Sequence, residues 1–237
     1  MAITKINGVP WANLSKVSGI AKASIAKVAG ESTVAIQTAT LSATKYAWYI
    51  VENTNWSLAV NAISAGNLYS SSLNIKSSVI STKGLSLYHN HRMNLQFDLS
   101  SYSTSSILSA TLLLDVNSIT TTATPNQVYV LDLGGATFIF PVPSPLYDPS
   151  GYTAARENYS LVYQSGSLTE YATDTINNTG LHELNFSAAA ITTANTHPSV
   201  YSMALLTYHD RNDIAPSLYN QYLVQLGSIP QLKITYQ

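Results

Sequence analysis

The residues best able to do chemistry in this chain are histidines and carboxylates that lie close together in the sequence. His89 and His91 stand two residues apart, so they share one face if the segment is a strand, and they could then ligate a metal ion. No carboxylate or third ligand stands at a diagnostic spacing from this pair. A surface or inter-strand role is therefore favoured over metal binding.

A second polar run, from His209 to Asp213, holds two carboxylates and an amide within four residues. Oxygen ligands of this kind suit Ca²⁺, although the run lacks the ligand spacing and the terminal Glu of an EF-hand loop. Asp210 and Asp213 are therefore candidate ligands of a structural calcium ion, and the alternative is a merely polar turn. We expect no other cofactor.

Hydrolysis of a glycosidic bond would need two carboxylates about 5 to 10 Å apart. The acidic residues that could supply such a pair are Glu157, Glu170, Asp174 and Glu183. Chance places similar pairs in any β protein, and the sequence has no Gly-x-Ser-x-Gly elbow, no Gly-rich phosphate loop and no cysteine. We therefore predict that the protein is not an enzyme.

Aromatic side chains could instead bind a sugar, because an aromatic face with a polar edge suits a pyranose ring. Besides 16 tyrosines the chain has three tryptophans. Trp48 lies in the run KYAWYIV and alternates into an expected core, whereas Trp56 begins the next expected strand and is the better candidate for exposed stacking. Trp11 lies near the N-terminus, where it is a candidate anchor to a partner.

The elements that must position these residues are strands. In Arg92 to Leu99 apolar and polar residues alternate strictly, which predicts a half-buried strand. Lys45 to Val51 and Ser57 to Ile63 are separated by a turn-forming segment and predict a hairpin. Further strands are expected at Leu108–Val116, Gln127–Leu133, Ala136–Phe140, Val200–Tyr208 and Gln231–Tyr236.

Helical periodicity is almost absent. Ser187 to Ala194 is short and Ala-rich, and predicts one or two helical turns inside a loop. Pro141 to Gly151 carries four prolines, which cannot donate to a sheet ladder, so this stretch is expected to be a loop. The fold class predicted for residues 32–237 is all-β, a jelly-roll-like antiparallel β-sandwich.

Residues 1–31 form a separate repetitive arm. The pattern apolar, small, Lys, apolar, small, Gly occurs three times with starts eleven residues apart, at Ile3–Gly8, Leu14–Gly19 and Ile25–Gly30. Glycine and β-branched residues predict short extended pieces separated by turns. Each unit is too small to bury its own apolar residues, so the arm should need a partner surface. The alternative is a flexible, mildly basic leader.

Charge separates the arm from the rest of the chain. Residues 1–30 contain four lysines and no acid, although the whole chain has a formal net charge of -1. That net charge gives no overall attraction for nucleic acid or an anionic membrane, and no apolar run is long enough to span a bilayer. Charged residues make up only 10% of the chain, which favours packing in an assembly. No uninterrupted apolar core of a secretory signal is seen near the N-terminus.

Two resemblances give these observations a context. Arg92–Ser100, followed by Ile107–Leu112, resembles the strand and Ser-Ala-Thr-Leu pattern of the DNRLRE family, and Pro230–Tyr236 resembles the closing strand of that family. This resemblance implies a jelly-roll sandwich of a noncatalytic module found on cell-surface, extracellular and phage proteins. The triple repeat looks like the N-terminal arms of many tailed-phage virion proteins.

Together the resemblances imply a structural protein of a phage virion, assembled in the host cytoplasm. It would be a head decoration or fibre protein, or a neck or tail accessory, with other virion proteins as partners and a homo-oligomer of three or more chains as its own state. The residues expected to contact the partner are Lys5, Ile6, Trp11, Lys16, Val17, Lys27 and Val28. The alternative is an extracellular or cell-surface module that binds a host glycan through Trp56.

Overall fold

A computed structural model describes most of the body and parts of the arm. The described residues are 5–6, 9–13, 16–17, 20–21, 27–28, 31–32, 35–61, 73–82, 84–122, 126–133, 168–196, 199–218 and 221–237. The strand expected at Ala136–Phe140, the loop at Pro141–Gly151 and the carboxylate of Glu157 lie outside them. The side chain of Trp48 also lies outside the described part of the structure.

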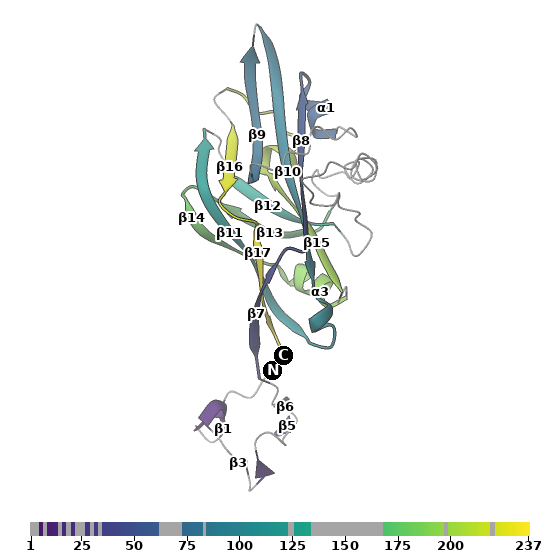
Figure 1. Cartoon of the computed structure of the whole chain (residues 1–237), viewed down its shortest axis with the longest axis vertical. Helices are drawn as coiled ribbons and strands as arrows, with labels where there is room; N and C mark the ends of the chain where they lie inside the picture. Colours follow the sequence, from purple (N-terminus) through teal and green to yellow (C-terminus); the bar gives the residue numbers. More distant parts are fainter. Residues whose placement is uncertain are drawn as a thin grey trace.

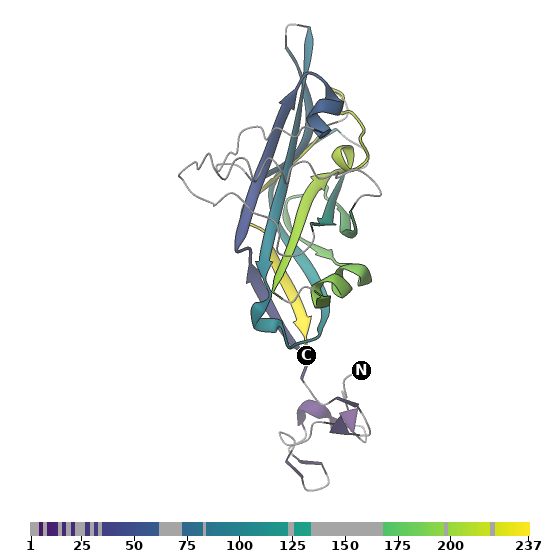
Figure 2. The same cartoon turned by 90° about the vertical axis from the view of Figure 1, so that its right-hand side faces the viewer.

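The body is an all-β, sandwich-like fold made from one curled antiparallel sheet (Figures 1 and 2). Within the described residues, strands follow the order β13-β12-β15-β10-β9-β16-β11-β17-β7, with β8 also paired to β10 and β14 to β11. The strands are β7 (Gln37–Ser42), β8 (Lys45–Asn53), β9 (Leu73–Thr82), β10 (Leu85–Asp98), β11 (Ile107–Thr121), β12 (Gln127–Asp132), β13 (Glu170–Thr175), β14 (Gly180–Asn185), β15 (Val200–Thr207), β16 (Tyr222–Leu226) and β17 (Gln231–Tyr236). The predicted fold class is confirmed.

Strand β10 pairs with three other strands, and its neighbour β9 joins them to the strands from β16 to β7. Along one edge its residues 88–96 pair with β8, and along the other edge residues 85–91 pair with β9 and residues 93–98 with β15. Strand β9 also pairs with β16 in the other half. The sheet therefore turns from one layer to the other at β9, and β10 is flanked by strands along nearly its whole length.

The alternating pattern of β10 is confirmed, but its half-buried character is wrong. Met93, Leu95 and Phe97 are fully buried in the main apolar core, together with side chains of β11, β16 and β17. The intervening side chains of Arg92 and Asn94 are buried as well. The reason is that polar groups of β15 and the segment after it pack against this second face. Burial of each large apolar side chain stabilises the fold by about 1.5–3 kcal/mol.

Short helices cover parts of the body. They are α1 (Trp56–Asn61), α3 (Ala188–Thr196), α4 (Tyr208–Arg211) and the 3₁₀ turn η3 (Ser100–Tyr102). The helix expected at Ser187–Ala194 is confirmed as α3. The strand expected at Ser57–Ile63 is wrong, because residues 57–61 belong to helix α1, in which Ala59 N–H donates to the Asn55 carbonyl. A run of five apolar and small residues has no periodicity that separates strand from helix.

The body has two distinct ends. Strands β9 and β10 form a long hairpin whose tip projects at one end, where Gly84 adopts a positive φ of 80° that favours glycine (Figure 1). Tyr236 of β17 pairs with Gln37 of β7 at the other end. The arm strands extend beyond this second end, so arm and hairpin tip lie at opposite poles (Figure 2).

Candidate functional site

The arm folds as three two-stranded hairpins that repeat the same register. Each repeated lysine begins a hairpin, and its apolar neighbour pairs with the residue three positions later: Ile6 with Val9, Val17 with Ile20, and Val28 with Glu31. The strands are β1 (Lys5–Ile6), β2 (Val9–Pro10), β3 (Lys16–Val17), β4 (Ile20–Ala21), β5 (Lys27–Val28) and β6 (Glu31–Ser32). The expected short extended pieces are therefore confirmed.

The cause of this register is visible in the sequence. Only two residues separate the paired strands, and the second is always glycine: Asn7-Gly8, Ser18-Gly19 and Ala29-Gly30. Two-residue connections with glycine in the second position favour the hairpin turns whose twist matches that of the strands. Each lysine pairs across its hairpin with an uncharged residue, Pro10, Ala21 or Ser32. The arm therefore repeats one cationic, apolar unit three times.

Trp11, the candidate anchor of the arm, is buried within the single chain. It follows the first hairpin in the 3₁₀ turn η1 (Trp11–Asn13), and only 8% of its surface is exposed within the single chain. An indole that is already buried cannot offer its face to a partner.

Trp56 is likewise not the exposed stacking platform that the sequence predicts. It begins helix α1 instead of a strand, and its side chain is 8% exposed. Its indole lies edge-on to the ring of Tyr88 in β10, with 5.8 Å between ring centroids. The helical turn rotates the indole toward β10, which explains the burial, whereas Leu58 of the same helix is exposed.

Asp210 is held by an arginine and not in an open loop. Its carboxylate accepts two hydrogen bonds from Arg92, at 2.5 Å from Nε and 2.6 Å from the second guanidinium nitrogen, and both side chains are fully buried. Helix α4 places Asp210 there because Thr207 caps its start and accepts the Asp210 N–H. The partner of the Asp210 carboxylate in this structure is therefore a guanidinium, and the calcium-ligand role of Asp210 stays a prediction.

Asp213 does not join Asp210 in a site. It is exposed, with a positive φ of 51°, and closes the turn after α4. Across the described residues no group of three or more His, Asp or Glu side chains is arranged to hold a metal ion. Three residues of this run, His209, Asp210 and Arg211, are buried in helix α4, so the run is more than an exposed polar turn.

The two histidines of β10 are buried and lie between strands. His89 Nδ1 lies 2.9 Å from a Glu52 carboxylate oxygen in β8, and the ring centroids of His89 and His91 are 6.4 Å apart. Burial, with help from the nearby Lys76 and His89, lowers the pKa of His91 to about 3. Burial and Lys76 also lower the pKa of His89, against the opposing effect of Glu52. Both rings are therefore neutral at neutral pH.

The carboxylates considered for hydrolysis are spread over two strands. Glu170 and Asp174 lie on β13 four residues apart, so their Cα atoms are about 13 Å apart along the strand. That separation exceeds the range for a glycosidase pair. Glu183 lies on β14, where its carboxylate forms a 3.5 Å ion pair with Lys233 of β17.

The polar network behind β10 is the feature that sequence reasoning missed. Ser77 of β9 donates to the Asn90 side-chain carbonyl at 3.2 Å and shares a 2.5 Å hydrogen bond with Thr207. Thr207 also caps α4, so these residues connect β9, β10 and β15 to the Arg92–Asp210 pair. The only sequence signal was the polar face of β10, which did not reveal partners more than a hundred residues away.

No family model and no curated protein matches the sequence. The resemblances to DNRLRE modules and to phage arms therefore remain predictions. Within the described part of the chain, no helix is long and apolar enough to cross a membrane.

Proposed function

We propose that this protein is a non-enzymatic structural protein of a tailed-phage virion, anchored to the particle by residues 1–31. Residues 32–237 would project from the particle or oligomerise as a head decoration or fibre protein, or as a neck or tail accessory. The observation that carries the proposal is the arm, in which one hairpin register recurs three times at a spacing of eleven residues.

The size of the arm hairpins supports an anchoring role. Each strand is two residues long, and an isolated two-stranded hairpin is at best marginally stable in water. Short strands can gain stability by adding to the edge of a partner's sheet, where main-chain hydrogen bonds provide the affinity. The repeated lysines would favour a partner with an acidic surface. Other virion proteins and further copies of this chain are the proposed partners.

Three linked hairpins would bind a partner with higher affinity than a single hairpin. When three linked units bind neighbouring sites, the second and third bind at the high effective concentration set by their short connections. Equal spacing would suit a partner surface that also repeats, such as an oligomer. An oligomer of three or more chains on our protein's side would multiply this effect again.

Among the residues that the structure describes, the main core is built without the arm. The buried cluster and the residues packed against it begin at Ala39, on strand β7. A chain that starts at residue 32 would keep β7 and its pairing with β17. Anchoring and folding can therefore be separated by experiment.

Deletion of residues 1–31 tests the proposal in the phage that encodes the protein. The truncated chain should remain folded and soluble, with an unchanged thermal unfolding midpoint, but should be lost from purified particles. Normal incorporation of the truncated chain would rule out the anchoring role. Light scattering of the purified full chain tests the oligomer, and a monomer at particle-like concentrations would contradict it.

A further inference from the structure

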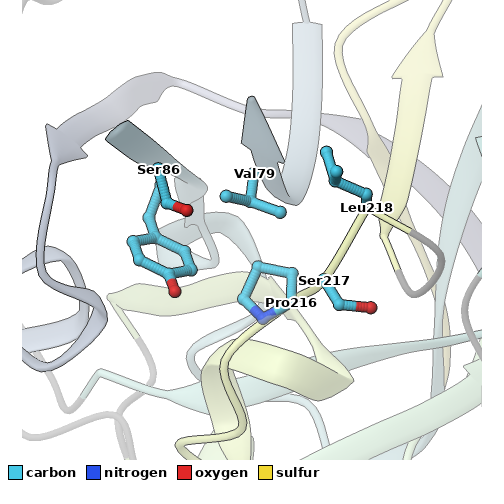
Figure 3. Close-up of a pocket in the computed structure, with 6 residues that line it drawn as sticks. Val79, Ser86, Pro216, Ser217 and Leu218 are labelled. Carbon is cyan, nitrogen blue, oxygen red and sulfur yellow. The ribbon is translucent and has the colours of Figure 1, made fainter. Parts of the chain in front are cut away.

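A pocket lies between the β9–β10 hairpin and the segment after α4 (Figure 3). Its volume is about 330 Å³, at the lower end of the range for small-molecule sites. Val79, Ser86 and Tyr88 line it from the hairpin, and the segment after α4 closes the other side with Pro216, Ser217 and Leu218.

The chemistry of the lining is mixed but uncharged. Val79 and Pro216 are buried and supply apolar surface from opposite sides, while Ser86 and Ser217 are exposed. Tyr88 contributes an aromatic ring with a hydroxyl group. A charged ligand would find no counter-ion among these residues, and an alkyl chain would cover hydroxyl groups without offering them hydrogen bonds. A ring with apolar faces and hydroxyl edges satisfies both requirements.

The aromatic wall is held in place from behind. Trp56 of α1 lies edge-on against Tyr88 at 5.8 Å, a favoured geometry for aromatic pairs. Because the indole is buried, it restricts the Tyr88 ring without occupying the pocket. At the rim Leu218 is 50% exposed, a large apolar side chain in contact with solvent. The site thus combines a fixed ring with an exposed apolar edge.

We propose that this pocket binds a neutral pyranose, as a terminal sugar of a glycan, with Tyr88 as the stacking surface and Ser86 as a hydrogen-bonding group. The inference goes beyond the anchoring function and rests on different residues. The sugar-stacking role that the sequence suggested for Trp56 is thus assigned to Tyr88, against which Trp56 packs.

The test uses the full chain and four methyl pyranosides, those of glucose, galactose, mannose and N-acetylglucosamine, measured by saturation-transfer NMR. At least one should bind at millimolar concentration. Leu218→Glu should weaken that binding by about tenfold or more, because a charge replaces the apolar rim. Leu181→Glu is the matched control, since Leu181 is 64% exposed on β14, outside the pocket lining, and should leave binding unchanged.

Tyr88→Phe and Tyr88→Leu separate stacking from general apolar contact. The phenylalanine variant should keep most of the binding and the leucine variant should lose it. Absence of signal from all four pyranosides, or equal loss with Leu218→Glu and Leu181→Glu, would overturn the proposal. Binding of the apolar dye anilinonaphthalene sulfonate without any pyranoside would also overturn it. Incorporation of Leu218→Glu into particles should be normal, which keeps this test independent of anchoring.

Discussion

Strands of the arm pair with residues that are close in the sequence, whereas strands of the body also pair with distant ones. In the arm every paired residue finds its partner three or five positions along the chain, and the same solution is used three times. In the body β10 pairs with three other strands, and its Arg92 binds Asp210, which is 118 residues away. Local, repeated structure suits attachment through several weak contacts, whereas long-range pairing produces one cooperative unit.

The largest effect should come from breaking the buried ion pair of the body. Asp210→Asn keeps the shape of the side chain but leaves the Arg92 guanidinium without its carboxylate. We expect the free energy of unfolding to fall by about 3–5 kcal/mol, as measured by urea denaturation of the full chain. The described residues of the main core all lie in the body, so the effect should be the same in the chain lacking residues 1–31.

Asp213→Asn is the matched control for this substitution. Asp213 is exposed and three residues from Asp210, and asparagine tolerates the positive φ of that position. We expect a change within about 0.5 kcal/mol. Equal effects of the two variants would mean that the Arg92 contact contributes nothing specific to the body.

Sequence reasoning succeeded where the determinants are local. The eleven-residue repeat predicts the short extended pieces of the arm and the turns between them, although not their pairing as hairpins. Strand β17 begins and ends where the β-branched and aromatic run Gln231–Tyr236 predicts. The alternation in β10 also predicts which side chains enter the apolar core. In each case the signal and the structure occupy the same few residues.

The same reasoning failed where a residue's role depends on distant chain segments. The sequence suggests that Asp210 is an exposed loop carboxylate, but in the structure it is buried and paired with Arg92 of β10. Trp56 reads as the start of an exposed strand, but the turn after β8 continues as a helix and turns the indole onto Tyr88. Both errors concern candidate sites, because burial of a polar or aromatic residue is decided by tertiary neighbours and not by its own position in a pattern.

An intermediate effect should appear on acidification, and only in the body. The pKa of His91 is lowered to about 3, whereas an unfolded chain protonates this histidine near 6.5. The contribution of neutral His91 to stability is therefore complete above pH 6.5 and is lost as pH falls toward 3. Between pH 6 and pH 4 the native protein should lose about 2 kcal/mol more than His91→Gln.

Urea denaturation at pH 7, 6, 5 and 4 measures this difference. The chain without residues 1–31 should show the same dependence on pH, since the arm contains no histidine. His89, which has a lowered pKa of its own, is present in both proteins, so the comparison isolates the contribution of His91. Parallel pH profiles for the native protein and His91→Gln would show that His91 is not buried in its neutral form.

The smallest effects should come from the arm lysines, and their pattern matters more than their size. If the three hairpins are equivalent, Lys5→Ser, Lys16→Ser and Lys27→Ser should each weaken attachment by a similar amount, about 0.2–1 kcal/mol for exposed charge contacts. Co-expression of each variant with the native chain measures this as the ratio of the two in purified particles. The triple variant should show the product of the three ratios, because the sites are separate in the chain. Lys233→Ser on β17 is the control and should be incorporated as the native chain is. A loss confined to one lysine would contradict the equivalence of the hairpins and identify one of them as the anchor. The body differs in this respect, because removal of either Arg92 or Asp210 leaves the other without its charged partner.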